Sequence, residues 1–193
     1  MRVLVVFCHP VESSFNAAIH AEVVAGLTAA GHEVDDCDLY AENFSPVLTR
    51  EERLGYHDIP SNRQYVDGWC RRLEAAEALV IVSPVWNFGW PAMLKGFFDR
   101  VFLPGVSFEM VDGRVKPRLR HIRKLGAVMT YGAHRTRAFL AGDPPRRIVR
   151  RVLRAQIAPF APLVHLVHYD MNRSTDETRG RFLKKVRGEM ERF

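Results

Sequence analysis

The chain has 193 residues, of which 47% are hydrophobic and 26% are charged. This length fills one core and is short for two ordinary domains, so we expect a single domain over residues 1–193. No apolar run reaches the roughly 18 residues that a membrane span needs, and no signal-peptide pattern follows Arg2. Three cysteines without a C-x-x-C pair indicate neither a disulfide framework nor a metal site. We therefore expect a cytoplasmic protein without membrane insertion or bound metal.

The formal net charge of +6 is unevenly distributed along the chain. Residues 114–154 contain thirteen Lys and Arg but only one acidic residue, Asp143, so the rest of the chain is net acidic. Such a segment can attract nucleic acid, a phosphorylated cofactor or an acidic partner, or it can be a solvated face. Because no nucleic-acid-binding motif accompanies it, we expect no nucleic-acid partner.

The first half of the chain begins with an apolar run at 3–8, which indicates a buried strand that ends at His9. Residues 15–30 carry apolar side chains at helical spacing, and Gly31 stands where a helix would end. A strand is expected at 33–40, followed by an irregular polar segment at 41–64 and a helix at 65–76. A strand covered on both faces is expected at 78–82, and a loop at 83–90.

In the second half, Pro91 suits the first residue of a helix that Pro104-Gly105 would end. The dipeptide Asp112-Gly113 predicts a short hairpin outside the sheet. A strand is expected at 125–131 and a basic amphipathic helix at 145–157. The last two elements are expected to be a strand at 163–169 and a closing helix at 175–193. Strands and helices alternate, which favours a parallel sheet with helices on both faces, a three-layer α/β sandwich.

The ends of the first and third strands suit a flat, phosphorylated ligand. The first strand leads into a hydroxyl- and amide-rich loop, Ser13 to Asn16, at the head of a helix, where free N–H groups and the helix dipole favour a phosphate. The dinucleotide fingerprint G-x-G-x-x-G is absent there. The third strand leads into an aromatic loop with Trp86, Phe88 and Trp90, whose rings could cover a heterocycle. A planar ring and a phosphate on one ligand suggest a flavin nucleotide.

Three motifs in a fixed order carry a resemblance to a known family. They are His9-Pro10 with Ser14-Phe15-Asn16, Asp38-Leu39-Tyr40-Ala41 with Phe44-Ser45-Pro46, and the stretch from Pro91 to Phe102. With these motifs the chain resembles, over nearly its whole length, the flavodoxin-like NAD(P)H:quinone oxidoreductases and their small bacterial members. The resemblance implies a flavodoxin-like three-layer sandwich with a five-stranded parallel sheet of order 2-1-3-4-5.

The resemblance also implies which residues contact a flavin. The phosphate region would be held by His9, Ser14, Phe15 and Asn16, the isoalloxazine by Pro84, Val85, Trp86, Asn87 and Phe88, and its other edge by Thr130, Tyr131 and Gly132. Better-known members have Thr-Gly-Gly in the fourth loop and then a tyrosine and a histidine, where this chain has Thr130 to His134. We therefore assign Tyr131 and His134 as candidate catalytic residues that protonate or polarise an acceptor. FAD and FMN both stay open, with FAD slightly favoured.

The activity implied by the resemblance is the transfer of two electrons from NADPH or NADH, through the flavin, to a quinone or a similar flat electrophile by a ping-pong mechanism. Azo and nitro compounds are further possible acceptors. The resemblance also implies a homodimer in which Phe97, Phe98, Phe108 and the hairpin face the second subunit. The alternatives are a flavodoxin-type electron carrier, which the positive net charge disfavours, and a regulatory flavoprotein subunit of a membrane transport system.

The remaining basic and histidine residues receive structural interpretations. The arginines between 146 and 154 follow helical spacing and are interpreted mostly as a solvated face, with steering of the NADPH phosphate as the lesser alternative. His57, His165 and His168 show no metal-ligand pattern and are interpreted as structural.

Overall fold

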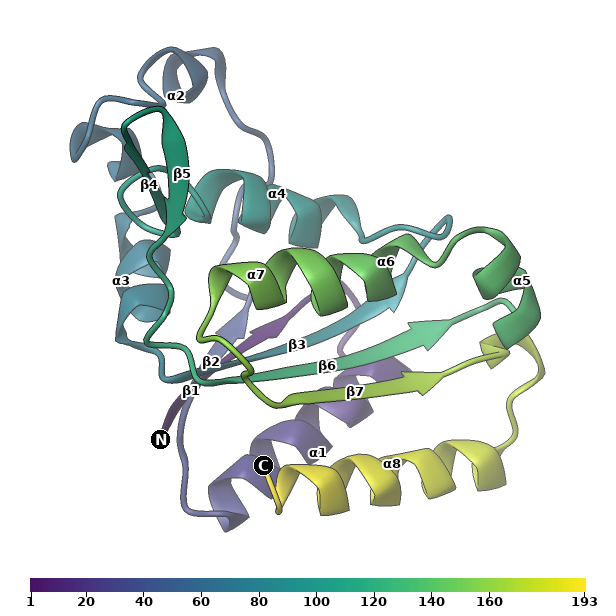
Figure 1. Cartoon of the computed structure of the whole chain (residues 1–193). Coiled ribbons are helices and arrows are strands. Elements are labelled where there is room, and N and C mark those ends of the chain that lie inside the picture. Colours follow the sequence, from purple (N-terminus) through teal and green to yellow (C-terminus); the bar gives the residue numbers. More distant parts are fainter.

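The computed structural model describes all 193 residues. At its centre is a five-stranded parallel sheet with the order β2-β1-β3-β6-β7, and helices cover both faces (Figure 1). This arrangement confirms the flavodoxin-like three-layer sandwich and the strand order 2-1-3-4-5. The five strands are β1 (Arg2–Phe7), β2 (Glu33–Asp38), β3 (Ala78–Val85), β6 (Lys124–Tyr131) and β7 (Leu163–His168).

The central strand β3 lies between β1 and β6, and all eight of its residues are buried. A strand covered on both faces needs apolar side chains on both, which accounts for the unbroken run from Ala78 to Val82. The strand continues to Val85, where a loop was expected from Ser83. It does so because Ser83, Pro84 and Val85 stay in register with Met129, Thr130 and Tyr131 of β6.

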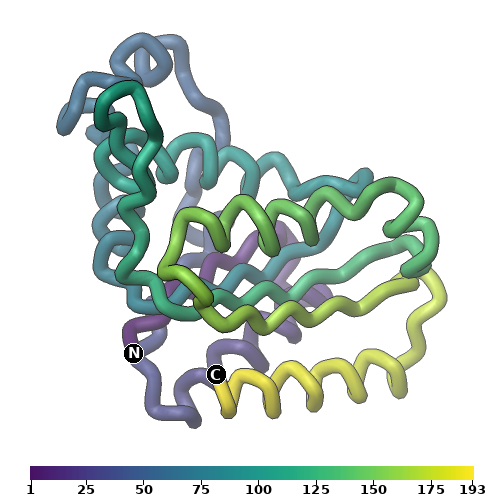
Figure 2. The backbone as a smooth tube through the Cα atoms, viewed as in Figure 1, coloured from purple at the N-terminus to yellow at the C-terminus, as the bar shows by residue number.

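One face of the sheet is covered by α1 (Phe15–Ala29) and α8 (Asp176–Met190), at the bottom of Figure 1. Gly26 of α1 allows the two helices to approach closely, since a Cβ there would lie 2.6 Å from Cβ of Met190. Both chain ends lie beside this layer (Figure 2). His32 connects them, with its Nε2 2.8 Å from the carbonyl oxygen of Phe193 and its Nδ1 3.4 Å from the Met1 amine.

The opposite face is covered by α3 (Asp67–Ala75), α4 (Ala92–Val101) and a third, irregular helix (Figure 1). The predicted basic helix over 145–157 is present as an unbroken helical run over 144–156, but its middle is π-helical, which was not expected. The segment consists of α6 (Pro144–Arg147), a π-helical stretch η2 (Ile148–Leu153) and a last turn α7 (Arg154–Gln156).

The short helix α5 (Arg135–Leu140) was not expected from the sequence. Its only buried residue is Ala138, whereas Phe139 and Leu140 are 76% and 82% exposed. A helix whose large apolar side chains face solvent lacks the buried stripe that hydrophobic periodicity detects, which explains why α5 was not predicted.

The segment 41–64 is more ordered than expected. It contains α2 (Arg50–Leu54), which begins with a capping box of Thr49 and Glu52, and a 3-10 turn η1 (Ser61–Arg63). Arg100 of α4 attaches this segment to the body of the domain. Its Nε donates to Oε1 of Glu52 at 2.8 Å, and a second nitrogen donates to the carbonyl oxygen of Ser45. Both side chains of the Arg100–Glu52 ion pair are buried.

The predicted hairpin is confirmed as β4 (Phe108–Val111) and β5 (Arg114–Pro117). Asp112 and Gly113 form its turn with φ of +51° and +71°, as a two-residue hairpin turn with positive φ at both positions requires. A 3-10 turn η3 (Met171–Arg173) connects β7 to α8. None of the helices is both long and apolar enough to cross a membrane.

Candidate functional site

The predicted site residues follow three strands that are neighbours in the sheet. β1, β3 and β6 are adjacent and parallel, so their carboxyl ends lie along one edge, and the loops that follow them lie side by side. In sheets of this kind ligands bind at that edge. The fold therefore brings together three of the segments that the sequence analysis singled out.

The first loop offers free hydrogen-bond donors at the start of α1. Ser14 caps the helix, with its Oγ accepting from the N–H of Ala17 at 3.1 Å. The backbone N–H groups of Phe15 and Asn16 have no acceptor within the protein. With the positive end of the helix dipole, they suit an anion such as a phosphate. The ring of Phe15 packs instead against His168 and Phe182, so only its backbone can serve the edge.

His9 lies between the first loop and the aromatic loop. Its Nδ1 is 3.1 Å from the backbone N–H of Val11, and accepting that hydrogen bond leaves the ring proton of a neutral histidine on Nε2. The imidazole stands edge-on to the Trp86 indole, with ring centroids 6.0 Å apart. The structure thus brings together these two predicted ligand-binding residues.

Asn16 and Thr130 join the first and third loops. The Asn16 amide donates from Nδ2 to Oγ1 of Thr130 at 2.9 Å, and both residues are buried. The other amide atom of Asn16, Oδ1, is buried without a hydrogen-bond donor. A buried acceptor without a donor costs on the order of 1–3 kcal/mol. The unpaired Oδ1 at this edge therefore suits a site where a bound ligand supplies the missing donor.

The aromatic loop after β3 begins with a tight turn. Trp86 and Gly89 exchange backbone hydrogen bonds of 3.1 and 2.9 Å, and the two residues between them, Asn87 and Phe88, have φ of +48° and +56°. The left-handed conformation costs a residue such as phenylalanine on the order of 1–2 kcal/mol, and such strain is found mostly at functional sites. The turn leaves Trp86 44% exposed and the N–H groups of Asn87 and Phe88 free. Pro84 and Val85 lie just before it as buried residues of β3.

Tyr131 ends β6 and points into the protein. It is 1% exposed, its hydroxyl donates to Oδ1 of Asp143 at 2.5 Å, and its ring lies 5.0 Å from that of Tyr169. Burial and the Asp143 carboxylate raise the pKa of Tyr131 well above its ordinary value. In this conformation the hydroxyl is engaged and shielded from solvent. The catalytic assignment of Tyr131 stays a prediction, and Asp143 is a partner that the sequence analysis did not pair with it.

His134 lies near Tyr131 in sequence, but its side chain is in a different environment. It is exposed and caps α5, with Nδ1 3.3 Å from the backbone N–H of Thr136. Between the two, Gly132 and Ala133 present N–H groups without an acceptor in the protein. No hydrogen bond connects His134 with Tyr131, so the structure does not join the two candidate catalytic side chains.

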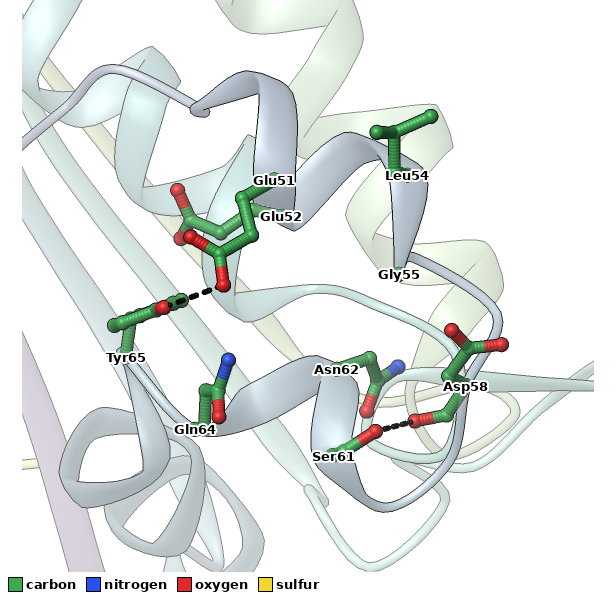
Figure 3. Close-up of a pocket in the computed structure, with 9 residues that line it drawn as sticks. All are labelled: Glu51, Glu52, Leu54, Gly55, Asp58, Ser61, Asn62, Gln64 and Tyr65. Carbon is green, nitrogen blue, oxygen red and sulfur yellow. Dashed lines mark hydrogen bonds between the residues drawn. The ribbon is translucent and has the colours of Figure 1, made fainter.

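Several hollows lie outside this edge. A polar pocket of about 330 Å³ is lined by Glu51, Glu52, Asp58, Tyr65 and neighbouring residues of 51–65 (Figure 3). It is formed around α2, which lies at the opposite end of the molecule from α5 in Figure 1. The residues around α2 thus form a cleft, which is separate from the strand ends.

An apolar groove of about 380 Å³ lies between α4, the hairpin and η2. Phe98 and Phe108, which the sequence analysis placed at a subunit contact, both line it. Phe97 does not. It is fully buried against Phe44 and Phe102, so the prediction that it faces a second subunit was wrong.

Comparison with known proteins agrees with the fold. Residues 1–161 match the family described as having a flavodoxin-like fold. The chain belongs to this flavodoxin-like family.

Within curated proteins, NAD(P)H dehydrogenase [quinone] 1 of Rattus norvegicus is 30% identical over 148 residues, which cover 68% of this chain and 54% of that protein. The chain spans about half the length of the curated relatives it matches.

Two solved structures extend the comparison over nearly the whole chain. The NAD(P)H:quinone oxidoreductase from Methanothermobacter marburgensis is 25% identical, with a TM-score of 0.84 over 99% of this chain and 98% of that one. An NADH-azoreductase from Bacillus anthracis, solved in complex with FMN, is 15% identical, with a TM-score of 0.75 over 99% and 98%. The second likeness concerns the fold alone.

Proposed function

We propose that the protein is a flavin-dependent NAD(P)H oxidoreductase that reduces a quinone or a similar flat electrophile. The observation that carries this proposal is the set of free N–H groups at three neighbouring strand ends, beside the exposed indole of Trp86. The names of the rat and archaeal relatives support the same class of reaction.

The residues at the edge fit a flavin nucleotide. The N–H groups of Phe15 and Asn16 would hold its phosphate, and those of Asn87 and Phe88 would bond one side of the ring system. Gly132 can approach the other side closely because it carries no side chain. The unpaired Oδ1 of Asn16 is available to a ligand hydroxyl or N–H. When bound, a flavin supplies the two-electron redox chemistry, and no covalent nucleophile from the protein is needed.

The protein's own contribution is to position donor and acceptor and to manage charge and protons. The free N–H groups of Asn87, Phe88 and Gly132 would stabilise negative charge at the edge. His134 is exposed and able to donate a proton to an acceptor oxygen, whereas Tyr131 would first have to leave Asp143. The donor and the acceptor would bind in turn at the same face of the flavin, which predicts ping-pong kinetics.

The apolar groove supports a homodimer. Its rim includes Val115 and Val152, which are 62% and 50% exposed, together with the half-buried Phe98 and Phe108. Covering such a surface with a second copy would remove apolar area from water. Sedimentation of the wild type and of Val152→Asp tests this. The wild type should sediment as a dimer, and the variant should shift toward monomer. A wild type that sediments as a monomer would contradict the proposed dimer.

The first experiment is an absorption spectrum of the purified protein, with the released cofactor identified by mass to distinguish FMN from FAD. A yellow protein bleached by NADPH or NADH and recoloured by a quinone supports the proposal. Trp86→Ala should weaken flavin binding roughly tenfold. The matched control is Phe160→Ala, which removes an aromatic ring that is 96% exposed away from the site.

Two outcomes would overturn the proposal. A protein that takes up neither FMN nor FAD would exclude it. The second outcome is a bound flavin that NADPH or NADH reduces but that no quinone, azo or nitro compound reoxidises. That result would instead favour an electron carrier or a regulatory subunit.

A further inference from the structure

The arginines between residues 135 and 154 lack the partners that most surface arginines have. None of the seven lies within 4 Å of a carboxylate oxygen, although twelve other arginines and Lys95 form ion pairs. The single acid in this stretch, Asp143, accepts the Tyr131 hydroxyl and is buried. The seven are Arg135, Arg137, Arg146, Arg147, Arg150, Arg151 and Arg154.

Two adjoining cavities hollow this surface. One, of about 540 Å³, is lined by Arg135, Arg146 and Tyr169 among others. The second, of about 380 Å³, is lined by Arg146, Arg150 and other arginines. Phe139, Asp143 and Arg146 line both, so the two hollows share a wall. The result is a concave surface with several guanidinium groups and one exposed aromatic ring.

The positive charge acts on the groups beneath it. Burial, together with the charges of Arg146 and Arg150, lowers the pKa of His165 to about 4, while Asp143 acts in the opposite direction. Arg146 and Arg135 also act on Tyr169, where they oppose the rise in pKa that burial causes. Asp143 lines both cavities and opposes the arginines, but it is the one carboxylate among the several arginines of the lining. The cavities therefore have a net positive charge, which a bound anion would neutralise.

The cavities lie beside the proposed active site. α5 follows directly after the loop that carries Gly132, and in Figure 1 it lies at the carboxyl ends of β6 and β7. The helix rises only about 9 Å over its six residues, so Phe139 stays close to the strand ends. Phe139 is 76% exposed, and its ring is free to stack on another flat ring.

We propose that this surface binds the phosphorylated adenosine end of the hydride donor and thereby selects NADPH over NADH. Arg135, Arg146 and Arg150 would hold the 2′-phosphate, since guanidinium groups bind phosphate oxygens with paired hydrogen bonds. The adenine ring would stack on Phe139. NADH has a hydroxyl where NADPH has the phosphate and so gains none of this charge interaction. The inference rests on the proposed function, because it names the donor used at that site.

Direct binding tests the site without turnover. The purified protein is titrated calorimetrically with 2′,5′-ADP, which has the 2′-phosphate, and with 5′-ADP, which lacks it. We expect 2′,5′-ADP to bind at least about tenfold more tightly at low salt, with the advantage shrinking as salt rises. Arg146→Gln should reduce that advantage about tenfold. Equal affinities for the two nucleotides in the wild type would overturn the proposal.

Two variants separate the parts of the site. Arg137→Gln is the matched control, because Arg137 lies on α5 with Arg135 and Phe139 but lines neither cavity. It should leave the preference for 2′,5′-ADP unchanged, and an effect as large as that of Arg146→Gln would contradict a localised site. Phe139→Ala should weaken both nucleotides by a similar factor, because it removes stacking and not charge.

Turnover provides the second readout. In the holoprotein, Arg146→Gln should lower the ratio of kcat/KM for NADPH to that for NADH about tenfold. If the protein binds 2′,5′-ADP selectively but holds no flavin, the proposed function fails while the phosphate site stands. If it reduces quinones with no preference between the donors, the function stands and the phosphate site fails. Arginine-dependent binding to duplex DNA or anionic vesicles, with no binding of 2′,5′-ADP, would also overturn the proposal.

Discussion

Arginines in two parts of the molecule are used in opposite ways. Arg100 is buried between α4 and α2, and its guanidinium is satisfied by Glu52 and by the carbonyl oxygen of Ser45. The seven arginines from 135 to 154 have no carboxylate partner. A paired and buried guanidinium fixes one segment of chain onto another. An unpaired group of guanidiniums contributes a positive potential that is available to a ligand.

The largest effect is expected from breaking the buried pair. Glu52→Gln removes the negative charge beside Arg100 while keeping the shape of the side chain, and it should lower the free energy of unfolding by about 3 kcal/mol. Urea denaturation measures the change. Glu51→Gln is the control, because Glu51 is the neighbouring exposed carboxylate, and it should cost no more than about 1 kcal/mol. Similar losses in both variants would remove the distinction between buried and exposed pairs.

An intermediate effect is expected at Arg72. Its guanidinium, 22% exposed, donates to Asp35 at 2.8 Å, to Glu42 at 2.6 Å and to the carbonyl oxygen of Asp36 at 2.6 Å. Arg72→Gln should cost about 2 kcal/mol in unfolding free energy, because three acceptors lose a charged donor. Arg71→Gln, whose side chain is 77% exposed, should change it by less than about 0.5 kcal/mol. Equal changes in unfolding free energy for the two variants would mean that the Arg72 network stabilises the fold no more than a single surface ion pair does.

The unpaired arginines predict a pH effect through His165. Its pKa is lowered from 6.5 to about 4, first by burial and then by Arg146 and Arg150. The folded state therefore binds the proton less readily than the unfolded state, so this stability is complete above pH 6.5 and is lost as the pH falls toward 4. After allowance for solvent screening, the loss is roughly 1–2 kcal/mol.

His165→Leu isolates that contribution. Unfolding free energies of wild type and variant are compared between pH 7 and pH 4, and the variant should decline less steeply by the amount that His165 accounts for. Parallel declines in the two proteins would show that His165 is not the group that titrates.

The smallest effect is expected from removing one unpaired arginine. Arg151→Gln relieves repulsion among like charges, so the variant should be more stable than wild type by about 0.3–0.5 kcal/mol at low ionic strength. The gain should vanish at high salt, where these charges are screened. Thermal unfolding at two salt concentrations measures it. A destabilised variant at low salt would indicate that Arg151 has a favourable partner.

Local sequence signals predicted most of the strands and helices that carry the site. They did not predict how the side chains are arranged within it. The apolar runs at 3–8 and 78–82 correspond to β1 and β3, and the Asp112-Gly113 turn lies where expected. Helix α5 was missed because its large apolar residues are exposed. The hydrogen bond from Asn16 to Thr130 joins residues 114 positions apart, and no local pattern encodes such a contact.

The sequence by itself determined the alternation of strands and helices, the Ser14 cap and the hairpin turn, since each depends on residues within a few positions of one another. Only the tertiary structure decided which charged and polar groups have partners. Arg100 meets Glu52 from 48 residues away, and Tyr131 donates to Asp143 instead of facing the edge. These pairings depend on how whole elements pack, because burial makes an unsatisfied polar group costly and so selects partners through space and not along the chain.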